Sequence, residues 1–140
     1  MASNILVRDI MSKDFRKVRP DTPVQEVIAT MTKFDADSIA VVQRTKIIGI
    51  ITTRDILVRM VEQCLAPKAL KAREIFTNPL VTISGSATVE EAAKLMKRNR
   101  IKHLPVVDGE KLVGMLSYTD IVFKVPSMLS MMEEVCRPSQ

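Results

Sequence analysis

The chain has 140 residues, of which 46% are hydrophobic and 26% charged, and its formal net charge is +5. This composition is typical of a globular protein with one ordinary core or two small halves, and no apolar run approaches the roughly 20 residues of a membrane span. The N-terminal sequence MASNILVRDIM lacks the cationic start and apolar stretch of a secretory signal, so we expect a cytoplasmic protein.

The first half predicts a β-α-β-β-α order. A short strand around residues 15–18 precedes a helix in which apolar residues recur every three or four positions from Val24 to Phe34, with Thr22 as the expected N-cap. Strands at 38–43 and 46–51, joined by a tight turn, come next. A second helix begins near Arg54, and its expected apolar face consists of Ile56, Leu57, Met60, Val61 and Cys64.

The second half predicts the same order. A strand around 80–83 is followed by a helix capped by Ser86 or Thr88, then by strands at 103–107 and 111–116 around an Asp108-Gly109 hairpin signal. The next helix begins near Thr119 and stops before Pro126, and SMLSMMEEV predicts a separate C-terminal helix.

These two halves are copies of one unit. Residues 65 positions apart match without a gap, and the identical pairs include Arg8/Arg73, Glu26/Glu91, Lys46/Lys111, Gly49/Gly114 and Asp55/Asp120. About 50 residues is too few for a secure independent core, so we expect an α+β fold in which two pseudo-symmetric β-α-β-β-α repeats pack through their sheets.

A repeated phrase lies at each strand-to-helix junction, KIIGIITTRD in the first copy and KLVGMLSYTD in the second. A helix N-terminus attracts anions, the hydroxyl of Thr52 or Ser117 can bond a phosphate or sugar oxygen, and the carboxylate of Asp55 or Asp120 can accept from ribose hydroxyls. The same Ser/Thr-x-x-Asp spacing is also a variant of the capping box, which needs no ligand. From the spacing alone, both interpretations stand.

Four segments carry a family resemblance: VRDIMSKDFRKVRPDTPVQEV, SIAVVQRTKIIGIITTRDIL, VTISGSATVEEAAKLM and IKHLPVVDGEKLVGMLSYTDIV. With them the chain resembles a tandem pair of cystathionine-β-synthase-type (CBS) domains, a Bateman module, here as a stand-alone protein. The expected bounds are 5–65 for repeat 1, 66–71 for the linker, 72–125 for repeat 2 and 126–140 for the C-terminal helix and tail. Ala40 departs from the family, which usually has the proline seen at Pro105.

The resemblance implies an adenosine-nucleotide site in each repeat. In the second repeat we expect ligand contacts from one set of residues: Pro79, Val81, Ile101, Lys102, His103, Pro105, Ser117, Tyr118, Thr119 and Asp120. In the first repeat the corresponding set is Asp14, Arg16, Asp37, Ser38, Ala40, Thr52, Arg54 and Asp55. For most of these residues ordinary packing is the alternative interpretation.

The two sites differ in charge. The second lies beside KLMKRNRIKH, whereas the first has Asp35 and Asp37 at the matching place, so we expect the Ser117/Asp120 cradle to bind a phosphorylated ligand more tightly. The basic stretch also suggests nucleic-acid binding as a hypothesis. Aromatic residues that could stack on bases are scattered and known nucleic-acid motifs are lacking, so a solvated helix face is the commoner explanation.

We expect no enzyme, because no nucleophile, base and orienting partner can be assembled, and His103 fits a partly buried structural position. Cys64 and Cys136 lack metal-site or redox spacing, so we expect free thiols and no metal.

The sequence therefore predicts a regulatory module that binds AMP, ADP, ATP or S-adenosylmethionine in inter-repeat clefts and signals to an unknown partner protein through a conformational change. No cofactor is required, no membrane contact is expected, and the resemblance implies a homodimer. The alternatives are a ligand-free dimerisation or assembly module and, third, a nucleic-acid-associated protein that uses the basic face of the second repeat.

Overall fold

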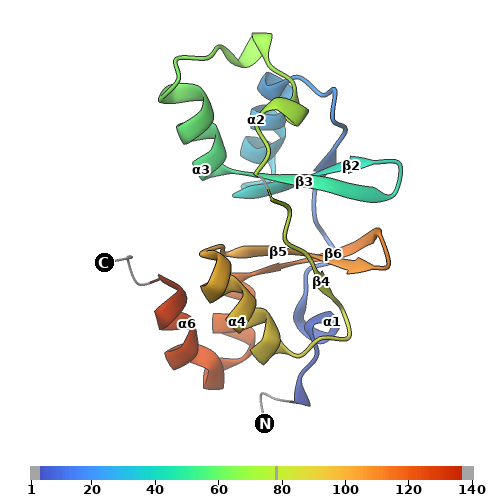
Figure 1. Ribbon diagram of the computed structural model, residues 1–140, viewed down its shortest axis with the longest axis vertical. Coiled ribbons are helices and arrows are strands. Elements are labelled where there is room, and N and C mark those ends of the chain that lie inside the picture. Colours follow the sequence, from blue (N-terminus) through green and yellow to red (C-terminus); the bar gives the residue numbers. More distant parts are fainter. Residues whose placement is uncertain (1–3, 78, 137–140) are drawn as a thin grey trace. The chain divides into compact units, whose positions relative to one another are not determined.

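In a computed structural model, which describes residues 4–77 and 79–136, the chain forms two units whose bounds differ from those of the sequence repeats (Figure 1). The first unit is Phe15–Leu80, and the second combines residues 4–14 with 81–136. Each unit therefore contains one repeat without its first segment, together with the first segment of the other repeat.

The first unit has the predicted order of elements. They are β1 (Lys17–Val18), α2 (Val24–Lys33), β2 (Ser38–Gln43), β3 (Lys46–Thr52) and α3 (Thr53–Ile56), which continues as the π-helix η2 (Leu57–Val61). Two 3-10 turns follow, η3 (Pro67–Ala69) and η4 (Ala72–Glu74).

The second unit begins with α1 (Val7–Ile10) and resumes after the first unit. Its further elements are β4 (Ile83–Ser84), α4 (Val89–Asn99), β5 (His103–Asp108), β6 (Lys111–Ser117), α5 (Tyr118–Lys124), the 3-10 turn η5 (Pro126–Met128) and α6 (Leu129–Cys136). The C-terminal helix is thus confirmed, and the rest of the predicted tail, residues 137–140, lies outside the described residues.

Both units build the same three-stranded arrangement. In the first, β1 runs parallel to β2 and β2 runs antiparallel to β3, while in the second β4, β5 and β6 pair in the same way. The register shifts once in each hairpin, between Val41 and Val42 and between Val106 and Val107, which are matching positions of the repeat. The α+β class and the duplicated order are therefore confirmed.

The first strand of each repeat is shorter than predicted. Only Lys17 and Val18 pair with β2, and only Ile83 and Ser84 pair with β5. Before these strands, Val81 still packs against the core and the Arg16 carbonyl accepts the N–H of Ala40, but neither Val81 nor Arg16 belongs to a strand.

Helix capping follows the sequence in one repeat and departs from it in the other. The hydroxyl of Thr88 caps α4 by accepting the backbone N–H of Glu91 at 3.1 Å. Thr22 does not cap α2, because its Oγ1 accepts the Arg19 N–H at 3.1 Å, and Pro23 occupies the N-cap position without a side-chain bond. The prediction for Thr22 was therefore wrong.

Burial explains why the units exchange their first segments. Ala72 and Ile75 lie in the core of the first unit with residues of α2 and β2, and Val7 and Ile10 lie in the core of the second with residues of α4 and β5. All four side chains are at most 8% exposed. Burial of these apolar side chains stabilises the packing of each first segment against the unit formed by the other repeat.

The expected apolar face of the helix after β3 is only partly buried. Met60 is 3% exposed, but Leu57 and Val61 are 57% and 67% exposed. The π-helical turn contributes, because the N–H of Glu62 bonds the carbonyl of Leu57 five residues earlier at 3.2 Å, which shifts the face relative to an α-helix. The prediction of a buried face was wrong for Leu57 and Val61, and Cys64 is also exposed.

The glycine of each repeated phrase allows a close approach. A Cβ at Gly49 would overlap the ring of Phe76, and a Cβ at Gly114 would overlap the Met11 side chain. Phe76 and Met11 occupy matching positions in the exchanged segments, so the same contact occurs once in each unit.

We expect Gly49→Ala to lower the free energy of unfolding more than Gly114→Ala. Overpacking costs roughly 1–3 kcal/mol, and a rigid phenyl ring accommodates an added methyl less readily than a flexible thioether does. Urea unfolding followed by circular dichroism measures both values. Equal losses would show that the flexibility of the covering side chain does not set the cost.

Candidate functional site

Each strand-to-helix junction is closed by a reciprocal cap. In the first unit the Asp55 N–H donates to Thr52 Oγ1 at 3.2 Å, and the Thr52 N–H donates to Asp55 Oδ2 at 2.8 Å. In the second unit the Asp120 N–H donates to Ser117 Oγ at 3.1 Å, and the Ser117 N–H donates to Asp120 Oδ2 at 2.9 Å. The capping-box interpretation is confirmed at both junctions.

In the first unit the Asp55 carboxylate has a further partner. Thr77 Oγ1 donates to it and lies 2.7 Å from both carboxylate oxygens. The Thr77 N–H bonds the Ile50 carbonyl at 2.9 Å, which holds this residue beside the end of β3. The carboxylate is therefore occupied by hydrogen bonds on both oxygens.

Sequence reasoning missed Thr77. The pairing of residues 65 positions apart places it opposite Ser12, so a hydroxyl at both positions was available as a signal. Ser12 bonds differently, because its Oγ accepts the Asp14 N–H at 3.2 Å, whereas its backbone pairs with Met115 as Thr77 pairs with Ile50.

In the second unit the Asp120 carboxylate has different partners from those of Asp55. Its Oδ2 serves the cap, and its Oδ1 lies 3.5 Å from Lys124 Nζ, the single ion-pair partner it has among residues 4–77 and 79–136. The Lys124 side chain is 49% exposed and also donates to the Ile10 carbonyl at 2.9 Å. One oxygen of Asp120 thus faces a cation that can move aside, and no hydroxyl occupies it as Thr77 occupies Asp55.

Several predicted residues of the first unit gather around the junction. Ser38 pairs with Thr52 across the hairpin, and the Thr53 N–H bonds the Asp37 carbonyl at 3.1 Å. Ala40 is fully buried and donates its N–H to the Arg16 carbonyl at 3.1 Å.

Two residues near this end of the first unit are turned to other partners or to solvent. The Arg16 guanidinium lies 3.7 Å from the centroid of the Phe34 ring, a cation–π contact. Arg54 is exposed on the first turn of α3. Asp14 belongs to the second unit.

The second unit brings together a matching group. His103 pairs with Ser117 across the hairpin, and the Tyr118 N–H bonds the Lys102 carbonyl at 2.8 Å. Thr119 Oγ1 lies 2.9 Å from Ser117 Oγ. The remaining predicted residues are the buried Pro105, the partly buried Val81 and Ile101, and Pro79, which is exposed and belongs to the first unit.

Tyr118 also links the cradle to the C-terminal helix. A hydrogen bond with the Cys136 side chain is the largest cause of a pKa of the Tyr118 phenol above its ordinary value, and nearby Glu133 adds to it. Lys102 Nζ lies 5.9 Å from the centroid of the Tyr118 ring. Tyr118 also packs against the core cluster that contains Met132 of α6, so this helix lies beside the junction between β6 and α5.

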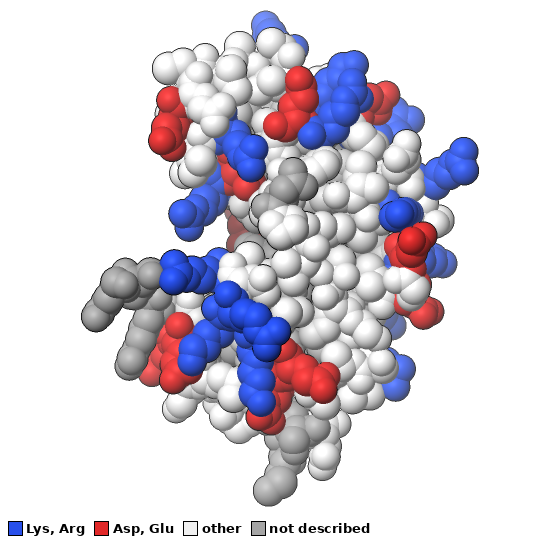
Figure 2. All heavy atoms as spheres, in the orientation of Figure 1, with Lys and Arg blue, Asp and Glu red and all other residues white. Residues whose placement is uncertain are grey.

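The basic stretch of the second repeat is partly neutralised. Lys94 pairs with Glu90 at 3.5 Å, and Lys97 pairs with Glu134 of α6 at 2.5 Å. Figure 2 shows acidic side chains among the basic ones over the region of α4. This mixed face is typical of a solvated helix and weakens the nucleic-acid alternative.

The described residues form neither a metal-binding cluster nor a membrane-spanning helix. Within residues 4–77 and 79–136, no three or more His, Cys, Asp or Glu side chains are grouped to hold a metal ion. Of the helices that the structure describes, none combines the length and the apolar character needed to span a bilayer.

Comparison with known families gives two matches along the chain. The CBS domain family model matches residues 7–62 and again residues 72–127. An uncharacterized protein of Methanopyrus kandleri is 30% identical over 139 residues, which is 98% of this chain and 71% of that protein.

Two further proteins are similar in sequence or structure. The mitochondrial CBS domain-containing protein CBSX3 of Arabidopsis thaliana is 34% identical over 107 residues, 73% of this chain and 52% of that protein, so the chain spans about half of its length. The crystal structure of the CBS domain pair of protein MJ0100, in complex with 5′-methylthioadenosine and S-adenosyl-L-methionine, has a TM-score of 0.77 and 27% identity, covering 87% of this chain and 96% of that one.

We expect Thr77→Val to lower the free energy of unfolding by about 1–3 kcal/mol, because it removes a hydroxyl donor from a part-buried carboxylate while keeping the side-chain volume. Ser12→Ala is the matched variant at the same place in the repeat, and it should lose less because Ser12 Oγ serves only an exposed N–H. Urea unfolding measures both. A larger loss for Ser12→Ala would contradict the role assigned to Thr77.

Proposed function

Because the chain belongs to the CBS domain family, with CBS domains at residues 7–62 and 72–127, we propose that it is a regulatory module that binds an adenosyl ligand at the Ser117/Asp120 cradle. The ligand is AMP, ADP, ATP or S-adenosylmethionine, and the module acts on a partner protein in the cytoplasm. A CBS pair is generally a regulatory module, and the matched segments carry no enzymatic domain.

One observation carries the choice of cradle. Asp120 keeps one carboxylate oxygen whose nearby group is the exposed Lys124 side chain, whereas the Thr77 hydroxyl lies 2.7 Å from both oxygens of Asp55 and shares its one proton between them. A ribose presents two hydroxyl donors, so it needs a carboxylate with acceptor capacity to spare. Ser117 and Thr119 add hydroxyls beside the N-terminus of α5, where a phosphate is favoured.

The MJ0100 domain pair supports the ligand class, because its crystal structure contains two adenosyl compounds. The similarity to that structure covers 87% of the present chain. Binding regulates only if the ligand has different affinities for two conformations. We propose that α6 responds, because Tyr118, beside the cradle, packs against the core cluster that contains Met132 of that helix.

We expect adenosyl ligands to raise the melting temperature of the wild-type protein and to lose this effect in Asp120→Ala. A ligand at about 100 times its dissociation constant adds roughly 2.7 kcal/mol, which is several degrees for a chain of this size. Because Asp120→Ala also removes a cap, the ligand-induced shift is compared for each variant with its own ligand-free melting temperature. Differential scanning fluorimetry with AMP, ADP, ATP and S-adenosylmethionine measures it.

Asp55→Ala is the matched control, since it removes the same cap from the other repeat, and Asp37→Ala removes a nearby acid. Both should keep most of the ligand-induced shift. Comparable losses in Asp55→Ala and Asp120→Ala would overturn the choice of cradle, and no shift with any of the four compounds would overturn the ligand class.

A second candidate function is assembly, which the exposed apolar residues of each unit favour. The helix after β3 exposes Leu57, Val58, Val61 and Leu65, and in the second unit Phe123 and Leu129 are 79% and 47% exposed. Exposed apolar side chains in such numbers favour association sites. We propose that a second copy of the chain covers these residues in a homodimer, with or without ligand.

We expect Val61→Asp and Phe123→Asp each to shift the protein towards monomer, because a buried carboxylate opposes association. The folded monomer should keep its circular dichroism spectrum, since both side chains are largely exposed within the chain. Sedimentation velocity measures the effect. Thr45→Asp, in the exposed β2–β3 turn, is the control and should leave the sedimentation unchanged; an unshifted Val61→Asp would argue against the dimer.

A further inference from the structure

The β2–β3 turn of the first unit carries an arginine where the backbone favours glycine. Arg44 has a φ of 60°, and the matching residue of the second unit, Gly109, has a φ of 65°. Left-handed backbone is unfavourable for residues with a Cβ, although Asp35, Cys64 and Arg100 also adopt it in this chain. The first unit therefore retains the Arg44 side chain where its own duplicate has none.

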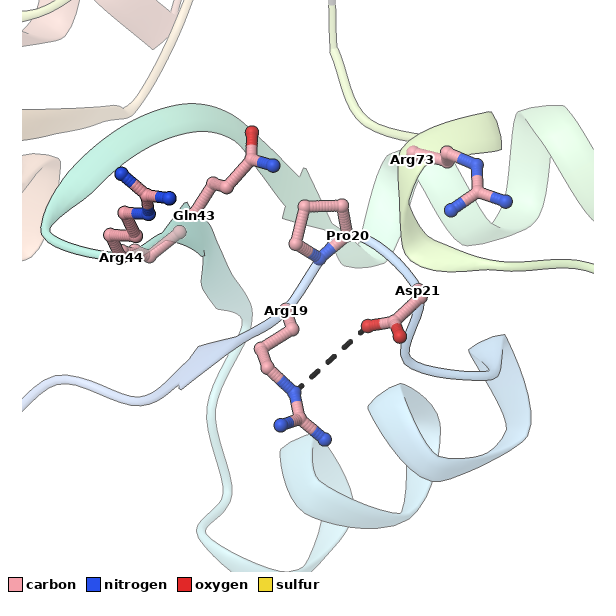
Figure 3. Close-up of a pocket in the computed structure, with 7 residues that line it drawn as sticks. Arg19, Pro20, Asp21, Gln43, Arg44 and Arg73 are labelled. Atoms are coloured by element: carbon pink, nitrogen blue, oxygen red, sulfur yellow. Dashed lines mark ion pairs between the residues drawn. The ribbon is translucent and has the colours of Figure 1, made fainter.

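Arg44 borders a hollow of about 270 Å³ whose lining is rich in arginine. The lining residues are Arg19, Pro20, Asp21, Val42, Gln43, Arg44 and Arg73. The three arginines come from the loop after β1, the β2–β3 turn and η4, and Figure 3 shows them around Pro20. A second hollow of about 430 Å³ shares Arg19 and Arg44 and adds one cation, Lys17, and one acid, Glu26.

Backbone hydrogen bonds fix the positions from which these side chains extend. The Arg73 N–H bonds the Pro20 carbonyl at 2.9 Å, and the Arg19 N–H bonds Thr22 Oγ1 at 3.1 Å. Thr22 returns its N–H to the Arg19 carbonyl at 3.1 Å. The hydroxyl that does not cap α2 thus shapes the loop on which Arg19 lies.

The charge of the hollow is positive. Asp21 is its single acidic lining residue, and it pairs only with Arg19, at 3.9 Å. Among residues 4–77 and 79–136, no carboxylate lies within ion-pairing distance of Arg44 or Arg73. Two guanidinium groups are therefore left to face solvent or a bound anion.

The second unit shows that the fold does not require this charge. Arg8 matches Arg73 and makes the same backbone bond, to the Gly85 carbonyl at 3.0 Å. The other matching positions of that unit are Ser84, Gly85, Ser86, Val107, Asp108 and Gly109. Of the three arginines only one has a counterpart, so the arginine cluster is a property of the first unit alone.

We propose that this hollow binds the phosphoryl groups of a small phosphorylated molecule, at a site separate from both cradles. The planar fork of a guanidinium group matches two oxygens of a phosphate, and several such groups favour an anion with more than one negative charge. The hollow lies at the turn of the hairpin, whereas Thr52 and Asp55 lie at its other end, about 20 Å away for a strand of this length.

Isothermal titration calorimetry with pyrophosphate tests the proposal independently of any adenosyl ligand. We expect saturable binding by the wild-type protein, weakened about tenfold or more in Arg44→Gly and in Arg73→Ala. Arg44→Gly should melt at the same temperature as the wild type or higher, because the left-handed turn suits glycine. Asp21→Asn should bind pyrophosphate more tightly, since it removes the acid from the lining.

Lys68→Ala removes one positive charge from the exposed η3 turn of the same unit and should bind pyrophosphate as the wild type does. Absence of saturable binding, or undiminished binding by Arg44→Gly and Arg73→Ala, would overturn the proposal. An equal loss in Lys68→Ala would identify the effect as general charge, and citrate binding as tightly as pyrophosphate would overturn the assignment to phosphoryl groups.

Discussion

Burial of Ala72 and Ile75 in the first unit is the constraint on which much of that unit depends. It brings Phe76 onto Gly49, Thr77 onto the Asp55 carboxylate, and Arg73 to the loop that contains Pro20. A single apolar attachment thus positions a packing contact, a polar contact at one cradle and part of a charged hollow.

The two repeats share their backbone contacts but differ in side-chain chemistry. Met11 covers Gly114 as Phe76 covers Gly49, and Ser12 follows the backbone path of Thr77 while its hydroxyl bonds elsewhere. Duplication preserved the scaffold, which depends on burial and main-chain hydrogen bonds. It left the exposed and half-buried polar positions free to diverge, and those positions separate the two cradles.

Local features were predictable from the sequence, because neighbouring residues determine them. The Ser/Thr-x-x-Asp spacing predicted both junction caps, the periodicity predicted α2 and α4, and Asp108-Gly109 predicted a hairpin. The bond from Thr77 to Asp55 joins residues far apart in the chain, and Thr22 had two competing partners close by, so neither outcome followed from a local pattern. The π-helical turn likewise left a predicted apolar face uncovered.

The exchange of first segments also bears on how the chain folds as it is synthesised. The first unit is continuous, so all of its residues are available once Leu80 has been made. The second unit is split, and the apolar side chains of α1 have no core to join until β5 and β6 follow, more than 90 residues later. Because domains generally fold as units during synthesis, the apolar side chains of α1 stay without their core until the second unit has been made.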